Sequence, residues 1–528
     1  ELLISQSPSG DTTHEILGRG ALSDDWVVLE NLRGATSDGE RLVVVADPAW
    51  EGIRYLRIQT SESPSWVSWG EVTILGIPAS EVVTPSTVPD RALPETGPDL
   101  ILHGGIVITV DSAFSLAEAI AVDRGVIVAV GGDAEVLALR SRDTAVIDLA
   151  GATVMPGIVD PHIHMIQREV PDQAAMGEAQ NSIIQSGRTT IGIPGANSSN
   201  LPEFGIFKER AILRIHLYVT YNTNCGEPPV EPDLWRSVAF DPVTDQVAVV
   251  GVKVFADGGS CMGPAVSWEY PDPLPPNIGF IDWTGRGSLF ISAEELADVV
   301  RTTDARGGQT VVHVAGDRAI VTALEGMEQA LQDFESPLRH RLDHNDFVPP
   351  EHRSRYSELG VVPVVFGDYD SCFESDGMWS LLAPESALGY HRANRSMIEA
   401  NPDLPIAWHS DLPFTVMDIF AQMQFLVTVA EVTEDGTYCD PPDFLADQGV
   451  DIDQAIRMMT WNSAYAMGLE EYAGSLEEGK WADLIIIERN PLEAATDEVH
   501  RNNVWATLIG GSVAYCAGPQ LLCASFGE

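Results

Sequence analysis

Residues 154–165 read VMPGIVDPHIHM, and the interpretation of the whole chain depends on this stretch. Its apolar residues predict a short buried strand that ends in His162-Ile163-His164. Because side chains alternate between the two faces of a strand, His162 and His164 point the same way and could hold a metal ion. A lone His-x-His motif is equally consistent with two polar residues in a loop. The rest of the chain has to decide between these two interpretations.

Length and charge narrow the classes of function. A chain of 528 residues is too long for one ordinary domain, and 45% apolar residues are enough for large cores. The formal net charge is -48, with lysine only at Lys208, Lys253 and Lys480. Such a surface repels nucleic acid and anionic membranes, so we expect neither as a partner. We find no apolar run long enough to span a bilayer.

The first 77 residues predict a separate all-β module. Strand-like segments at 26–29, 41–46 and 53–58 alternate with Gly, Asp and Ser, and residues 65–76 close the module. The segment IRYLRIQTSESPSWVSWGEVTILG resembles the last strands of discoidin-type (F5/8 type C) β-sandwiches. This resemblance implies a glycan or another surface ligand, and a packing module without a ligand is the alternative. Residues 78–98, rich in Pro, Ser and Thr, predict a linker.

The remainder predicts an α/β catalytic region. Residues 99–156 and 471–516 carry similar strand groups and predict one small β-sandwich built from both flanks, followed by a tail at 517–528. Between them, in 157–470, strands and helices alternate, which indicates a parallel sheet. Eight candidate strands with intervening helices fit a (β/α)8 TIM-like barrel, whose chemistry lies at the carboxyl ends of the strands. Helical periodicity appears at 293–305, 317–331 and 453–466.

Four further candidate ligands come from these strands. Lys253 interrupts an apolar strand, although lysine is almost never buried without a partner. A buried lysine readily loses its proton, and the neutral amine can take up carbon dioxide to form a bridging carbamate; a lysine that reaches the barrel rim is the alternative. His313, His344 and Asp411 end other apolar strands. Each alone is typical of a structural residue, but together they predict one metal site.

Several motifs resemble the amidohydrolase superfamily, most closely the amidohydrolase 3 or YtcJ-like branch. They are VMPGIVDPHIH, GVKVFADGG, GGQTVVHVAGDRAI, RHRLDHNDFVPPEHRSRYSELGV, HSDLPF and AGSLEEGKWADLIIIERNPL. The resemblance implies two divalent metal ions, with zinc as the first choice and manganese, nickel or iron as alternatives. The implied metal ligands are His162, His164, carbamylated Lys253 as the bridge, His313, His344 and Asp411.

This ligand set implies hydrolysis of an amide-like C–N bond in a small molecule (N-acyl, N-formyl or cyclic amide) by metal-activated hydroxide. Asp411 is the expected catalytic base and acid. Asp317 is either a supporting partner of the metal site or a helix N-terminal residue. His409 replaces the smaller residue expected there, and we expect it to touch the substrate or to brace the metal site.

Two other functions stay open at this point. The first is a mononuclear-metal deaminase on the same fold, which generally lacks the lysine and uses a glutamate shortly after the fifth-strand histidine. Here Lys253 is present and residues 314–317 contain no glutamate. The second is a non-catalytic extracellular binding protein. Homo-oligomerisation is left open.

Six cysteines lack any Cys-x-x-Cys pair, which argues against a thiolate zinc site. Neighbouring strands bring them together in pairs, which predicts the disulfides Cys225–Cys261, Cys372–Cys439 and Cys516–Cys523. Disulfides persist in oxidising compartments, so we expect a secreted or extracytoplasmic protein.

Overall fold

The computed structural model divides the chain into two compact units, residues 1–92 and 93–528. Residues 97–526 are described apart from 169–172, 241–245, 276–277, 279–281, 333–335, 368–370 and 373–376, and before residue 97 only the backbone of six strands is described. The predicted linker at 78–98 lies outside the described residues except at its last two positions.

The described strands of the first unit form two antiparallel sheets, ordered β4-β1-β6 and β3-β2-β5. Their bounds are β1 Leu2–Gln6, β2 Asp11–Arg19, β3 Val27–Ala35, β4 Arg41–Leu42, β5 Tyr55–Glu62 and β6 Ser68–Val72. Much of the discoidin-like segment lies outside the described residues, so that identity stays a prediction.

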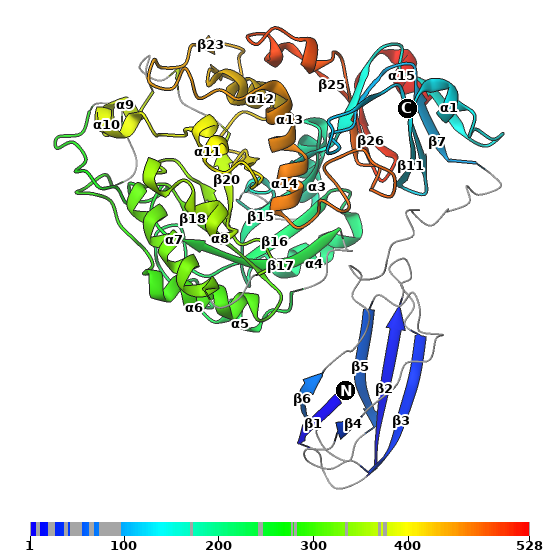
Figure 1. Ribbon diagram of the computed structural model, residues 1–528, viewed down its shortest axis with the longest axis horizontal. Helices are drawn as coiled ribbons and strands as arrows, with labels where there is room; N and C mark the ends of the chain where they lie inside the picture. The colour runs from blue at the N-terminus through cyan, green and yellow to red at the C-terminus, as the bar shows by residue number, and fades with distance from the viewer. Residues whose placement is uncertain are drawn as a thin grey trace. The chain divides into compact units, whose positions relative to one another are not determined.

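Eight parallel strands form the central sheet of the second unit in the order β14-β15-β16-β17-β18-β19-β20-β21 (Figure 1). Their bounds are β14 Ile158–Asp160, β15 Arg188–Ala196, β16 Arg214–Thr220, β17 Val247–Phe255, β18 Gln309–Val314, β19 Arg341–His344, β20 Val362–Phe366 and β21 Ala407–His409. The barrel is nearly closed. Beyond the strand ends, His164 N donates to Leu412 O at 2.7 Å and Asp411 N donates to His162 O at 3.0 Å. The predicted TIM-like barrel is therefore confirmed in this coarse form, and its seam is bridged where candidate ligands lie.

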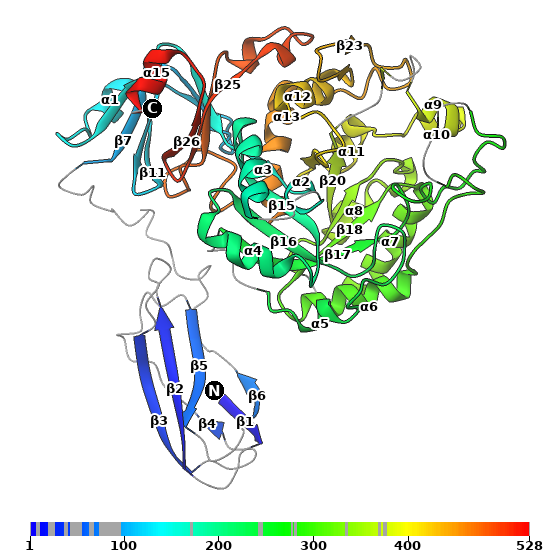
Figure 2. The same ribbon diagram turned by 180° about the vertical axis from the view of Figure 1, so that it is seen from behind.

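Between residues 157 and 470 the described residues form thirteen α-helices, several of which cover the outside of this sheet (Figure 2). They are α2 Met165–Arg168, α3 Gln173–Gln185, α4 Leu201–Phe207, α5 Leu234–Ser237, α6 Ala293–Asp304, α7 Asp317–Leu331, α8 Arg355–Leu359, α9 Trp379–Leu382, α10 Glu385–Leu388, α11 Asn394–Ala400, α12 Ile419–Thr428, α13 Ile452–Met459 and α14 Trp461–Ala466. Ser292 begins α6 by accepting a hydrogen bond from Glu295 N, as N-cap serines do. The helices predicted at 293–305 and 317–331 are confirmed.

The single helix predicted at 453–466 is wrong in one respect. Thr460, with φ -128° and ψ -92°, separates α13 from α14. Its hydroxyl donates to Ile456 O, which is a local bond that threonine makes in competition with regular helix. Apolar periodicity continues across the break because both helices bury the same side against the barrel, so periodicity alone does not show it.

Strands from both flanks of the barrel region build two further sheets, ordered β11-β10-β7-β12 and β26-β25-β24-β13-β8-β9. The bounds are β7 Leu100–His103, β8 Ile106–Ile108, β9 Leu116–Ala117, β10 Ala119–Asp123, β11 Val126–Gly131, β12 Ala145–Asp148, β13 Thr153–Pro156, β24 Leu484–Ile487, β25 Val504–Ile509 and β26 Ser512–Cys516, with helices α1 Asp133–Leu137 and α15 Gln520–Ser525. In the larger sheet Val154 of β13 lies opposite Ile486 of β24. Only Gly157 separates β13 from β14, and a Cβ there would meet the Thr189 side chain at 2.3 Å. The first barrel strand is thus anchored to this two-sheet unit.

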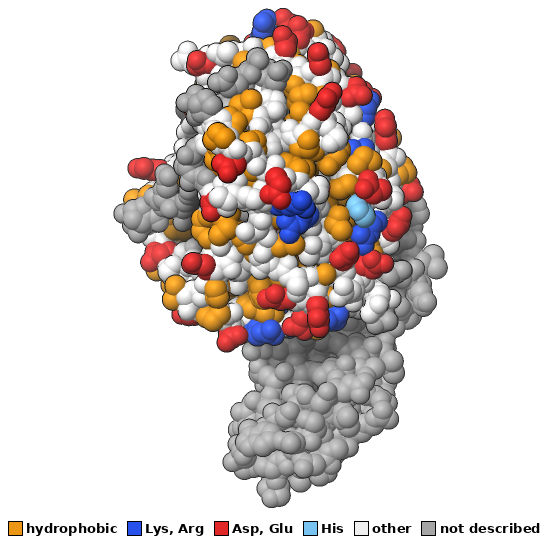
Figure 3. All heavy atoms as spheres, turned by 90° about the vertical axis from the view of Figure 1, so that its left-hand side faces the viewer, with side chains coloured by type: hydrophobic (Ala, Val, Ile, Leu, Met, Phe, Trp, Pro, Cys, Tyr) orange, Lys and Arg blue, Asp and Glu red, His pale blue; other side chains and the backbone are white. Residues whose placement is uncertain are grey.

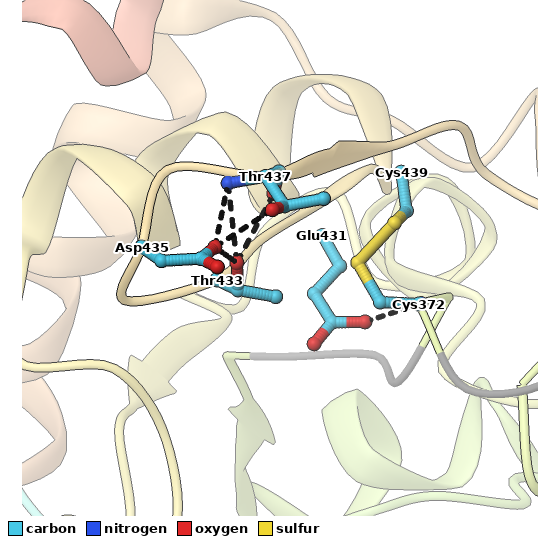
Figure 4. Close-up of a disulfide and its surroundings, with 6 residues drawn as sticks. All are labelled: Cys372, Glu431, Thr433, Asp435, Thr437 and Cys439. Carbon is cyan, nitrogen blue, oxygen red and sulfur yellow. Dashed lines mark hydrogen bonds between the residues drawn. A yellow bond between two sulfur atoms is a disulfide. The ribbon is translucent and has the colours of Figure 1, made fainter.

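The three predicted disulfides are confirmed, with Cα–Cα distances of 5.4 Å for Cys225–Cys261, 5.3 Å for Cys372–Cys439 and 5.7 Å for Cys516–Cys523. Figure 4 shows Cys439 at the end of a small hairpin made by β22 Glu431–Val432 and β23 Tyr438–Cys439. The Asp435 carboxylate organises its turn by accepting from Thr433 Oγ1 at 2.6 Å and Thr437 Oγ1 at 2.7 Å. These hydrogen bonds lower the pKa of Asp435 to about 2. Three disulfides indicate an oxidising environment.

The surface shows the acidity expected from the composition. On the face in Figure 3, acidic side chains are scattered among apolar and neutral ones, with few basic side chains. Among the described residues, no helix combines the length and apolarity needed to cross a bilayer.

Candidate metal centre

The structure brings the six predicted ligands together at the carboxyl ends of the barrel strands. His162 and His164 follow β14, and Asp411 follows β21 across the seam. The other three are Lys253 in β17, His313 in β18 and His344 at the end of β19. Strand register explains this convergence, because His313 lies opposite Phe255 of β17 and Asp343 of β19.

Three donor atoms at the seam form a nearly equilateral triangle. His162 Nε2 lies 3.3 Å from His164 Nε2 and 3.5 Å from Asp411 Oδ1, and the last two atoms are 3.4 Å apart. Tetrahedral ligands with bonds of about 2.0–2.1 Å are about 3.3–3.4 Å from one another. The spacing of this triangle therefore matches one face of a tetrahedral metal site. Lys253 Nζ is also close, 3.4 Å from His162 Nε2.

His162 is oriented by Asp343, a residue that the sequence analysis did not select. His162 Nδ1 donates to Asp343 Oδ2 at 2.7 Å, which leaves the lone pair on Nε2, the atom in the triangle. Arg341 Nε lies 3.1 Å from the other carboxylate oxygen, and both side chains of this ion pair are fully buried. The sequence did contain a signal for Asp343, because it is an aspartate inside an apolar strand, one position before His344.

The seam itself is held by Asp160, a second residue that the sequence analysis did not select. Its buried carboxylate accepts from Arg188 Nε at 2.8 Å and from Ser410 Oγ at 2.5 Å. Ser410 directly precedes Asp411, whose φ of 58° lies in the left-handed region. Such a conformation costs a non-glycine residue about 1–3 kcal/mol and persists only where surrounding contacts enforce it. The bond from β14 to Ser410 is one such contact.

The far half of the site contains His313 and His344, whose ring centroids are 4.3 Å apart. His313 Nε2 donates to Gly258 O at 3.0 Å, so Nδ1 keeps the lone pair. His344 also has a left-handed backbone, with φ 78°. The next residue supports this turn, because Asn345 Nδ2 donates to Leu342 O at 2.6 Å.

Burial keeps His162, His313 and His344 neutral, as metal ligands must be. Burial, followed by the positive charge of Lys253, lowers the pKa of His162 far below its ordinary value and that of His313 to about 3. The pKa of His344 is also far below its ordinary value, because of burial and then the neighbouring His313. Burial lowers the pKa of Lys253 to about 8, with Asp343 opposing it. About a tenth of such an amine is unprotonated at pH 7, far more than for an ordinary lysine.

His409 and Asp317, which were predicted to support the site or touch substrate, take different places. His409 ends β21 inside the site: its ring stacks on His162 with centroids 4.7 Å apart and meets His344 edge-on at 4.6 Å. Asp317 begins α7, and its Oδ1 accepts from Ser267 N at 2.7 Å and Arg318 N at 2.9 Å. These contacts tie a loop to the helix start, and the described residues show no bond from Asp317 to the histidines.

Aromatic rings surround the histidines. Phe255 lies 5.3 Å from His313, and Phe366 lies 5.4 Å from His409, measured between centroids. Phe414, with 52% of its surface exposed, lies edge-on to His164 at 6.2 Å. An exposed aromatic ring beside the donor triangle gives an arriving molecule an apolar surface.

The donor set fits a divalent metal. Asp411 Oδ1 is buried and accepts no hydrogen bond from any described residue, although buried polar atoms are normally satisfied. One donor atom each from His162, His164 and Asp411 lies within 4.8 Å of the other two. Neutral imidazoles with a carboxylate are typical ligands of zinc and similar ions. A cation between these atoms would satisfy the buried oxygen.

The model of the amidohydrolase family matches residues 207–515, more than half of the chain. The chain belongs to this family. Its metal dependence agrees with the histidine and aspartate cluster, and the predicted superfamily branch is confirmed.

Relatives and solved structures agree with this assignment. The N-substituted formamide deformylase of Arthrobacter pascens is 27% identical over 296 residues, which cover 54% of this chain and 49% of that protein. The protein LONG AFTER FAR-RED 3 of Arabidopsis thaliana is 25% identical over 266 residues, or 50% of this chain and 42% of that one. The chain thus spans about half the length of these relatives or less. An uncharacterized metal-dependent hydrolase of Pyrococcus furiosus has the same fold, with a TM-score of 0.60 and 15% identity over 75% of this chain and 100% of that one.

Proposed function

We propose that this protein is a metal-dependent hydrolase of an amide-like C–N bond in a small molecule. The observation that carries the proposal is the triangle of His162, His164 and Asp411 donors, 3.3–3.5 Å apart at the carboxyl end of a barrel. Family membership supports the same chemistry. Among the alternatives, a deaminase shares the metal requirement, whereas a binding protein does not need it.

We assign a separate role to each candidate residue of the site. His162, His164 and Asp411 would hold one ion, and His313 and His344 the other, with Lys253 between them. When bound, divalent ions supply Lewis acidity that polarises a carbonyl oxygen and lowers the pKa of water. Asp411 takes the proton of the attacking water and delivers it to the leaving nitrogen, which then departs as an amine. The exposure of its side chain, 15%, leaves it accessible from the barrel mouth.

Lys253 is proposed to carry a carbamate that would be a ligand of both ions, and zinc is the proposed metal. Its amine is fully buried in β17 and 3.4 Å from His162 Nε2, and its charge also lowers the pKa of His313 in the other half of the site. Intact mass of the metal-loaded protein tests this directly. A lysine without added carbon dioxide in protein holding two ions would contradict the carbamate.

For the substrate, we infer a small N-formyl or N-acyl amide with an apolar substituent. The Arthrobacter pascens relative is an N-substituted formamide deformylase, which supports the N-formyl class. The aromatic rings of Phe366 and the exposed Phe414 would contact the apolar part. The three disulfides support action outside the reducing cytoplasm.

A substrate screen with metal analysis tests the proposal. Zinc-replete protein is assayed against N-formyl amines, N-acyl amino acids, cyclic amides and lactones, with Asp411→Asn as the inactive control. We expect release of an amine from at least one amide class and about two ions per chain. One ion per chain with ammonia release from an aminated ring would favour the deaminase, and protein without metal or turnover would favour the binding protein.

A further inference from the structure

His409 is a buried histidine for which the proposed reaction has no role. Its side chain is 0% exposed, and neither ring nitrogen has a hydrogen-bond partner among the described residues. Buried polar atoms without a partner destabilise the folded state, so such atoms in a folded protein call for an explanation. A metal ion would satisfy one of these nitrogens.

The neighbours of His409 are themselves candidate ligands. One donor atom each from His162, His344 and His409 lies within 4.8 Å of the other two, and all three residues are buried. This is a second group of converging donors beside the seam triangle, with His162 common to both groups. A site with three imidazole ligands binds zinc, cobalt, nickel or copper in preference to magnesium or calcium.

His162 cannot serve both groups at once. Its Nδ1 donates to Asp343, which leaves Nε2 as the single coordinating atom, and Nε2 lies in the seam triangle. Once His162 binds an ion there, His344 and His409 are left as the converging pair of the second group. His313, the expected partner of His344, belongs to neither group among the described residues.

We propose that His409 is a metal ligand that binds the second ion together with His344. This inference rests on the proposed metal-dependent function and adds a seventh protein ligand to the six predicted ones. It also makes the second ion position richer in imidazole, so its occupancy depends less on a carbamate at Lys253. The two earlier expectations for His409, contact with substrate and bracing of the site, become outcomes of the test.

The test replaces His409 by cysteine, whose thiolate gives a distinct absorption spectrum when it binds Co²⁺. All six cysteines are in disulfides, so the wild-type protein has no thiolate to offer an ion. His409→Cys protein loaded with Co²⁺ should show sulfur-to-cobalt charge-transfer absorption that the wild type lacks. The matched control is His391→Cys, because His391 is equally buried but packs on Phe347, with ring centroids 4.4 Å apart, outside both donor groups. It should show no such band.

A second variant measures the loss of the ligand. His409→Gln should retain one tightly bound Co²⁺ per chain and bind the second at least about tenfold more weakly, measured by Co²⁺ titration and elemental analysis. Far-UV circular dichroism checks that each variant is folded. Anomalous diffraction from crystals of the wild-type protein loaded with Co²⁺ tests the same ligand without any substitution. There we expect an ion about 2.0–2.1 Å from a His409 nitrogen.

The possible failures are distinguishable. Wild-type protein that binds no Co²⁺ would overturn the proposed function itself. Two ions bound with unchanged affinity in His409→Gln, and no charge-transfer band in His409→Cys, would overturn only the role of His409. A raised KM without any change in metal binding would then assign it to the substrate.

Discussion

The two halves of the metal centre are built differently. At the seam, backbone bonds between the ends of β14 and β21 and the Asp160–Ser410 hydrogen bond hold three donors in tetrahedral spacing. On the far side, His313 and His344 stand on separate strands with ring centroids 4.3 Å apart, and among the described residues His313 belongs to no group of three converging His, Cys, Asp or Glu donors. The difference teaches that barrel closure organises one ion position, whereas the second position depends on side chains from separate strands, to which we propose that His409 is added.

The loops near the two halves are also held differently. The disulfide Cys225–Cys261 joins the segments that follow β16 and β17, on the Lys253 side of the site. At the seam, hydrogen bonds join the ends of β14 and β21, and the disulfide Cys372–Cys439 links segments further along the chain after β20 and β21. The first three changes below test this contrast and the fourth tests a buried histidine of the barrel, beginning with the largest expected effect.

Asp411→Asn should break the seam half most severely. The amide keeps the shape but cannot accept a proton, so kcat/KM should fall by about 10²–10⁴. Steady-state kinetics on the substrate found by screening measures this. Asp435→Asn, which changes an exposed carboxylate on a hairpin turn, is the control and should keep wild-type activity. Full activity in Asp411→Asn would exclude its catalytic role.

Removing Cys225–Cys261 should destabilise the loops of the far half. This disulfide spans 36 residues, and the chain-entropy relation gives a loss of about 4 kcal/mol in the free energy of unfolding. The paired serine substitutions at Cys225 and Cys261 are compared by urea unfolding with the same change at Cys516 and Cys523. The latter pair spans 7 residues and should cost about 2.5 kcal/mol. Equal losses would show that loop length does not set the effect here.

Asp343→Asn should weaken the seam half without touching its three donors. The substitution removes the charge that orients His162, and metal affinity should fall by about 10–100-fold. Competition with a chelator measures the affinity of folded protein. Asp346→Asn is the matched control, because Asp346 pairs with Arg392 at 2.8 Å rather than with His162. An unchanged affinity in Asp343→Asn would separate Asp343 from the metal site.

His216→Gln should reduce the loss of stability in acid. Burial, followed by the positive charge of Arg341, lowers the pKa of His216 to about 3. The unfolded chain takes up this proton near pH 6.5, so the folded state loses stability as the pH falls from about 6.5 towards about 3. Between pH 7.5 and 5.0 the wild type should lose about 2 kcal/mol more than the variant. Denaturant titrations at both pH values measure this, and parallel curves would show that His216 is not the source.

Much of this architecture could be predicted from the chain. The barrel and its helices followed from alternating apolar runs, two disulfides from cysteines that follow neighbouring strands, and the third from two cysteines close together in the tail. The break between α13 and α14 at Thr460 could not be predicted, because a local kink leaves the apolar periodicity intact. The roles of Asp160 and Asp343 could not be predicted, because each depends on a partner far away in sequence. Asp160 binds Ser410, 250 residues further along the chain, and Asp343 binds His162, 181 residues before it.

The central claim is that the seam triangle binds metal. Anomalous diffraction from zinc-loaded crystals tests it most directly. We predict an ion about 2.0–2.2 Å from His162 Nε2, His164 Nε2 and Asp411 Oδ1. Zinc bound elsewhere, with no anomalous peak between these three atoms, would contradict the account.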